Sequence, residues 1–159
     1  MKLLALAAIL SASTALPARA DPYLARCQMG ECIHYDQSDR QIVGQGSAAV
    51  PGDLVRVTLR SAVSGSPDTP MAELDWEEPS PVQFFCSTAR PAFMNGDASY
   101  TALDLVTPVG ATTMITTMYL RACHPELTTI DDPFSAASSL GYRATTTDRF
   151  ETFAALIRG

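Results

Sequence analysis

The sequence has almost no lysine. Lys2 is the single one, and lysine and arginine together number 11 against 17 acidic residues, a formal net charge of −6 at pH 7. An acidic protein of this kind is repelled by nucleic acids and by anionic lipid surfaces. The composition therefore argues against nucleic acid as a partner. The negative charge would favour encounter with a basic protein, but solubility explains the same charge and is the favoured interpretation.

Long hydrophobic runs are also missing, apart from one at the start of the chain. Residues 3–10 follow Lys2 and are apolar but too short to span a bilayer. Ala18-Arg19-Ala20 then offers small residues at both positions that a signal peptidase reads. We expect residues 1–20 to be a cleaved signal peptide and residues 21–159 to form one domain.

Two kinds of membrane anchor are alternatives to cleavage. The short apolar run disfavours an uncleaved helical anchor. A lipid anchor on Cys27 is rejected, because Arg26 occupies a position that needs a small residue. Cleavage leaves nine arginines against 17 acidic residues, a charge of −8. The prediction is a periplasmic or secreted protein with no stable membrane insertion.

Cysteine is scarce but even in number. The four cysteines all lie in the exported part, where an oxidising compartment favours two disulfides. A two-residue turn at Met29-Gly30 would place Cys27 opposite Cys32 in a non-hydrogen-bonded pair, close enough for a disulfide. By elimination Cys86 pairs with Cys123. We expected this second disulfide to join two core strands.

Motifs for catalysis and metal binding are sparse. The two histidines, His34 and His124, lack metal-ligand spacing, and oxidised cysteines offer no thiolate, so no metal site and no cofactor are predicted. The Cys86–Cys123 disulfide would bring Ser87 beside His124, and Asp104 would complete a triad. No G-x-S-x-G motif surrounds Ser87, and we assign no catalytic residue.

Alternating and aromatic segments predict a mainly β fold. Asp53 to Val63 alternates apolar and polar residues, as a half-buried antiparallel strand does. Asp131-Asp132-Pro133 predicts the start of a helix over 134–140, and Asp148 with Glu151 predicts a second. The expected fold is an antiparallel β-sandwich or barrel-like domain with two short C-terminal helices; the alternative is an α+β fold with helices on one face of the sheet. Further strands are expected at residues 23–28, 31–36, 41–43 (after a turn at 37–40), 82–87, 91–94, 100–106 and 112–123.

The one long loop, Ser64 to Pro81, holds five acidic residues and the single tryptophan, Trp76. Loops longer than about 12–15 residues are often functional. Burial of Trp76 as an anchor for the loop is the favoured interpretation. The alternative makes Asp75-Trp76-Glu77-Glu78 an exposed contact for a basic protein. The sequence therefore predicts a non-enzymatic binding module of the cell envelope; a small hydrolase centred on Ser87 and His124, or a purely structural protein, are the alternatives.

Overall fold

The computed structural model describes residues 21–109 and 112–158, so the expected signal peptide lies outside the described residues. Seven antiparallel strands form one open sheet in which each strand pairs with the next along the chain. The mainly β expectation is confirmed. The strands are β1 (Tyr23–Gln28), β2 (Glu31–Gln45), β3 (Asp53–Ser64), β4 (Ser80–Cys86), β5 (Ala92–Met94), β6 (Tyr100–Ala102) and β7 (Arg149–Phe150).

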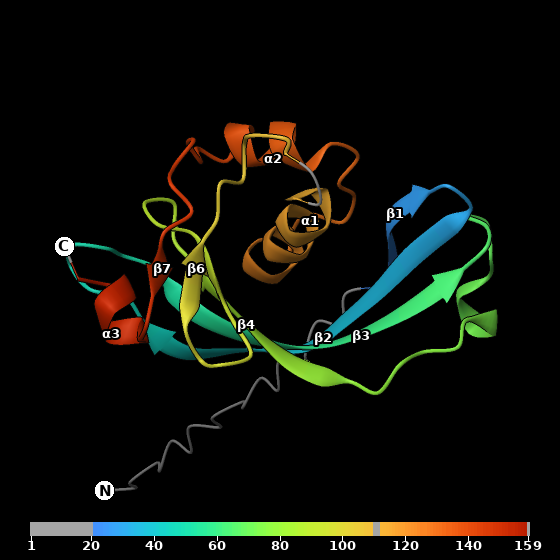
Figure 1. The fold of residues 1–159 in the computed structure, drawn as a ribbon, viewed down its shortest axis with the longest axis horizontal. Helices are drawn as coiled ribbons and strands as arrows, with labels where there is room; N and C mark the ends of the chain where they lie inside the picture. Colours follow the sequence, from blue (N-terminus) through green and yellow to red (C-terminus); the bar gives the residue numbers. More distant parts are fainter. Residues whose placement is uncertain (1–20, 110–111, 159) are drawn as a thin grey trace, which may run out of the picture.

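Four short helical segments accompany the sheet: η1 (Met71–Glu73), α1 (Thr112–Cys123), α2 (Pro133–Ser139) and α3 (Phe153–Leu156). The sheet is strongly curved, with α1 and α2 on its concave side and α3 beside β7 at one end (Figure 1). No helix among the described residues is long and apolar enough to cross a membrane.

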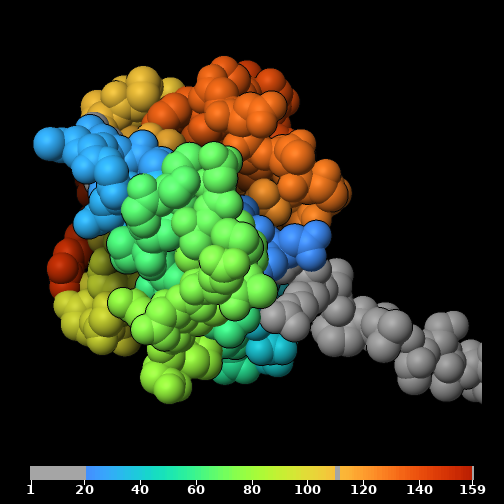
Figure 2. Space-filling model, turned by 90° about the vertical axis from the view of Figure 1, so that its right-hand side faces the viewer, coloured from blue at the N-terminus to red at the C-terminus, as the bar shows by residue number. Residues whose placement is uncertain are grey.

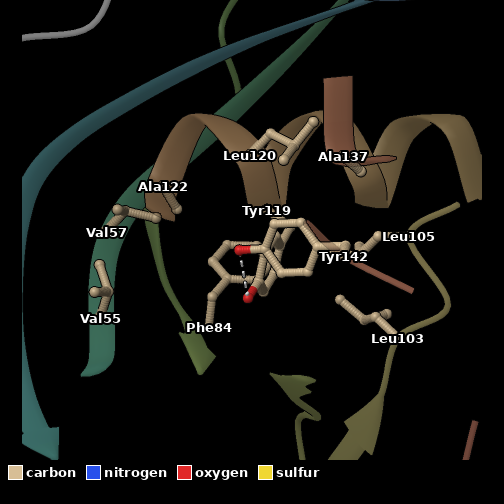
Figure 3. Packing of buried hydrophobic residues seen from close by; sticks show 10 residues of the cluster. All are labelled: Val55, Val57, Phe84, Leu103, Leu105, Tyr119, Leu120, Ala122, Ala137 and Tyr142. Carbon is tan, nitrogen blue, oxygen red and sulfur yellow. Dashed lines mark hydrogen bonds between the residues drawn. The ribbon is translucent and has the colours of Figure 1, made fainter. Parts of the chain in front are cut away.

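The two faces of the sheet carry separate cores. Val55 of β3 lies opposite Phe84 of β4, and both pack in the larger core with Tyr119 of α1 (Figure 3). Their neighbours Leu54 and Phe85 point to the other face, because successive strand residues alternate. That second core is closed by α3, whose Leu156 is fully buried, together with Val50, Ala92 and Tyr100.

The predicted strand at residues 112–123 is wrong: this segment is helix α1. Threonine and isoleucine favour strands, but propensity is readily overridden by burial. Tyr119 and Leu120 are completely buried in the core that α1 shares with the sheet and α2. The hydroxyl of Thr117 donates to the carbonyl oxygen of Thr113 at 2.9 Å, which gives one threonine a partner within the helix.

β2 differs from the expectation as well. Residues 37–40 do not form a turn between two strands; β2 runs unbroken from Glu31 to Gln45. Its register with β3 shifts between Ser38 and Gln41, and Asp39 there has a φ of 51°. A β-bulge thus takes up the polar residues that suggested a turn.

Three further expectations concern the C-terminal half. Asp132 does cap α2, accepting a hydrogen bond from the Phe134 amide at 3.1 Å. A helix starting at Asp148 is wrong, because 149–150 form β7 and Thr152 caps α3 instead. The strand expected at 100–106 ends at Ala102.

Both predicted disulfides are confirmed. Cys27 faces Cys32 across the β1–β2 hairpin, with Cα atoms 4.0 Å apart, and Met29 and Gly30 form its turn with φ of 55° and 81°. Cys86 and Cys123 have Cα atoms 5.3 Å apart. The second disulfide joins strand β4 to helix α1 rather than two strands. Two disulfides fit an oxidising, extracellular-type environment.

Candidate functional site

The segment from Gly65 to Pro79, which we call the acidic loop, carries five acidic residues and no basic one. No arginine or lysine lies between Arg60 and Arg90. The loop protrudes between the ends of β3 and β4 and forms the middle of one end of the molecule (Figure 2). All five carboxylates of the loop are on exposed residues: Asp68, Glu73, Asp75, Glu77 and Glu78.

Trp76 holds the loop against the sheet. Its indole Nε1–H donates to the carbonyl oxygen of Met71 at 3.3 Å, and the guanidinium of Arg60 lies 4.8 Å from the ring centroid. Arg60 is itself fixed, because its Nε and Nη2 donate to a carboxylate oxygen of the buried Asp36 at 2.9 and 2.7 Å. The tryptophan remains half-buried. It therefore anchors the loop, as the favoured interpretation has it, and still presents part of its ring to solvent.

The acidic residues that flank Trp76 are exposed to solvent. Glu77 is tied down, since its amide donates to the Ser61 carbonyl at 2.8 Å and its carboxylate accepts from the Ser61 hydroxyl. Asp75 and Glu78 form no ion pair with any described residue. Two exposed carboxylates without an ion pair among the described residues therefore flank, along the chain, a tryptophan held by Arg60 and Met71.

Exposed apolar side chains gather at the same end. Cys32 pairs with Ser64, so the tip of the β1–β2 hairpin lies next to the start of the acidic loop. Met29 at the hairpin tip is 98% exposed, Val63 is 59% exposed and Leu24 is 40% exposed. Leu24 and Val63 lie on opposite faces of the sheet, so these residues are exposed singly near the loop and do not form one continuous patch.

The proposed triad residues have other partners. The Ser87 hydroxyl donates to the Pro51 carbonyl at 2.6 Å and accepts from the Arg90 amide at 3.3 Å. Asp104 accepts from the amides of Val106 and Thr107, each at 3.1 Å. Burial raises the pKa of Asp104, but these amides and the Thr107 hydroxyl outweigh it and hold the pKa below its usual value.

His124 belongs to a different hydrogen-bonded chain. Its Nε2 lies 2.8 Å from the hydroxyl of Tyr142, and Nδ1 lies 3.2 Å from a carboxylate oxygen of Glu126. The Tyr142 hydroxyl donates to that of Tyr119 at 3.4 Å, and Tyr119 donates to the Phe85 carbonyl at 3.1 Å. Burial raises the pKa of both tyrosines. This row of hydrogen-bonded side chains connects α1 to β4, and each of its hydroxyl groups already has a hydrogen-bond partner.

One close histidine–serine contact escaped the sequence reasoning. His34 is fully buried and its Nε2 lies 2.9 Å from the hydroxyl oxygen of Ser64, whereas its Nδ1 has no hydrogen-bond partner. The Ser64 hydroxyl donates to the Ser66 carbonyl at 2.7 Å, so it can only accept from the histidine. His34 Nε2 is therefore protonated and donates to Ser64. The sequence places His34 on the face of Cys32 but cannot give the β2–β3 register that brings Ser64 to it.

No group of three or more histidine, cysteine or acidic side chains that could hold a metal occurs within residues 21–109 and 112–158. Comparisons with protein-family models, curated proteins and solved structures found no match. Function has therefore to be argued from the chain's own surface and side chains.

Proposed function

We propose that this protein is an exported, non-enzymatic binding module of the cell envelope, periplasmic or secreted, whose acidic loop contacts a basic protein. The observation that carries the proposal is Trp76, held in place by Arg60 and the Met71 carbonyl with the unpaired Asp75 and Glu78 beside it.

Rigidity is what makes this arrangement suited to binding. An interface that uses a preformed aromatic anchor loses less side-chain entropy than one that must order it. Arg60 and Met71 have already restricted the tryptophan. Exposed carboxylates around it would steer a positively charged partner and select against an acidic one.

The neighbouring apolar residues define the partner further. Met29 and Val63 would meet aliphatic side chains, while Asp75 and Glu78 would meet arginine or lysine. The expected partner surface is thus basic and partly apolar. A hydrolase centred on Ser87 and His124 is the weaker proposal, because Ser87 donates its hydroxyl proton to a backbone carbonyl and His124 contacts Tyr142 and Glu126.

The test compares two charge-matched double variants of the mature chain. Asp75→Asn with Glu78→Gln removes the two unpaired carboxylates of the loop; Asp131→Asn with Glu151→Gln removes two exposed carboxylates elsewhere. The probe is a synthetic peptide of alternating arginine and leucine, measured by fluorescence anisotropy at low and physiological salt. Trp76→Ala is measured in parallel.

We expect the loop double variant to bind about three- to tenfold more weakly at low salt, from the usual worth of two exposed charge pairs. The control double variant should bind like the unchanged protein, and the difference should shrink as salt rises. Equal weakening by the two double variants would mean that net charge alone attracts the peptide, and the loop would have no special role.

A further inference from the structure

Two arginines of this acidic protein lie on the same side of the β1–β2 hairpin, and neither side chain has a hydrogen-bond partner among the described residues. Arg26 belongs to β1 and Arg121 to the last turn of α1. The Nε atoms of both are buried and unpaired. We propose that Arg26 and Arg121 form a binding site for a small oxyanion, a carboxylate or phosphate group, between the hairpin and helix α1.

A β-bulge brings Arg26 to this side. Tyr23 pairs with Tyr35, and the register shifts before Arg26 pairs with Ile33. Because Tyr35 and Ile33 are two residues apart on β2, they share a face, and the bulge puts Tyr23 and Arg26 on that face too. Without the bulge Arg26 would point to the opposite side. Bulges that redirect one side chain are common next to functional sites.

Helix α1 brings the second arginine to the same place. The guanidinium of Arg121 lies 4.6 Å from the ring centroid of Tyr23, and the Tyr23 and Tyr35 rings are 6.1 Å apart. The positive charge of Arg26 acts on the Tyr35 hydroxyl, whose pKa is nevertheless raised by burial. Arg121 therefore lies on one of two neighbouring tyrosine rings, and Arg26 belongs to the same face of the hairpin as that tyrosine pair.

The donors of this site are little used within the described chain. Arg121 makes neither a hydrogen bond nor an ion pair with a described residue, and Arg26 makes one long ion pair, to Glu31 at 3.9 Å. The Tyr35 hydroxyl has only a 4.0 Å contact with the sulfur of Met114. Most other arginines donate hydrogen bonds to a carbonyl, amide or carboxylate oxygen. Arg26 and Arg121 differ from them, although the protein as a whole has more acidic than basic residues.

The guanidinium groups favour a carboxylate or phosphate group as the ligand. Their planar fork of N–H donors matches two oxygens of a carboxylate or phosphate, and such charge-assisted pairs are strong. Two nearby acids limit the charge that the site can take: Glu31, and Glu77, whose charge acts on Tyr35 while its carboxylate accepts from Ser61. A small anion fits this balance better than a polyanion.

The experiment follows the arginine Nε–H signals of the mature protein by ¹H–¹⁵N NMR. Inorganic phosphate and acetate are titrated in separate arms, against sodium chloride at equal ionic strength. We expect a saturable shift of the Arg26 and Arg121 signals in at least one arm and none with chloride. The arm that saturates at lower concentration distinguishes a phosphate ligand from a carboxylate.

Variants distinguish a defined site from general electrostatic attraction. Arg26→Gln should remove the saturable shift of the Arg121 signal. Arg121→Lys keeps the charge and should weaken anion binding at least fivefold, whereas Arg143→Gln, on an exposed loop, should leave binding unchanged. Glu31→Gln should tighten binding about two- to fivefold, because a competing carboxylate is lost. Circular dichroism of each variant without anion checks that it is folded. Shifts that rise linearly with concentration, or that equal those of Arg143, would overturn the proposal and would leave the acidic loop's role untouched.

Discussion

Protonation of His34 should make this protein lose stability as the pH falls below neutrality. The imidazole is completely buried between β1 and β3, where its strand neighbours are Leu24 and Ala62. Burial disfavours the charged ring and lowers the pKa of His34 below its usual value of 6.5. The nearest charged pair on the same face is Asp36 with Arg60, whose charges already offset each other.

The sign follows from proton linkage. In the unfolded chain His34 takes up a proton as the pH falls through about 6.5, whereas in the folded protein it stays neutral until a lower pH. The unfolded state thus binds more protons in this window, and the free energy of unfolding decreases as the pH drops through it. Below the folded pKa the loss is complete, and above about pH 7.5 His34 contributes no pH dependence.

The structure gives the size of the effect. A protonated ring would carry an Nδ1–H with no acceptor, because Nδ1 has no hydrogen-bond partner. An unsatisfied buried donor costs about 1–3 kcal/mol. We therefore expect the unfolding free energy to fall by about 1–2 kcal/mol between pH 7.5 and pH 5, because proton uptake by one unfolded histidine contributes at most about 2 kcal/mol over this window. Each kcal/mol corresponds to roughly 4 °C in Tm.

Urea denaturation followed by circular dichroism at pH 5, 6, 7 and 8 measures this directly. His34→Gln retains an amide that can bond Ser64 and cannot titrate, so its profile should be flat across the window. His124→Gln is the matched control, since His124 is partly exposed and already paired with Glu126. A pH profile of His34→Gln as steep as that of the unchanged protein would refute the reasoning.

Three other outcomes are expected. Replacing Cys86 and Cys123 together by serine should lower the unfolding free energy by about 3–4 kcal/mol, since the disulfide closes a 37-residue separation, as urea titration would show; a change below 1 kcal/mol would contradict it. Dilute peroxide should oxidise Met29 before any other described methionine, because it is 98% exposed, and peptide mass spectrometry would reveal a different order if this is wrong. Tyr119→Phe should lower the unfolding free energy by about 0.5–1.5 kcal/mol, because it removes the hydroxyl bonds to the Ser87 amide and the Phe85 carbonyl, which keep their bond to each other; an unchanged melting temperature would exclude that role.

The sequence predicts the local features of this fold better than its long-range ones. The alternation in β3, the Asp132-Pro133 helix start and the two-residue turn between Cys27 and Cys32 each depend on neighbouring residues, and each is confirmed. β2 was divided wrongly because its polar residues 37–40 form a bulge, and only pairing with β3 decides between a bulge and a turn.

The candidate sites show the same limit. The sequence identifies Trp76 and its acidic neighbours, but the stacking of Arg60 on the ring depends on how β2 and β3 bring Asp36 and Arg60 together. The contact between His34 and Ser64 joins residues 30 positions apart, and no motif announces it. Likewise Arg26 belongs to the anion site only because a bulge turns it toward α1.

Helix α1 is the element for which residue propensity predicts the wrong secondary structure. A 12-residue helix rich in threonine is marginal by itself in water. The surrounding structure supplies what the segment lacks. Tyr119 is buried against Phe84 of the sheet, and side chains of β2 donate to helix carbonyls, Gln37 to Met118 at 3.2 Å and Arg40 to Ala122 at 2.8 Å. The disulfide from Cys123 then fixes the end of the helix to β4. The conformation of this segment is consequently a property of the curved sheet around it, and the arginine that it presents to the β1–β2 hairpin is placed by the same contacts.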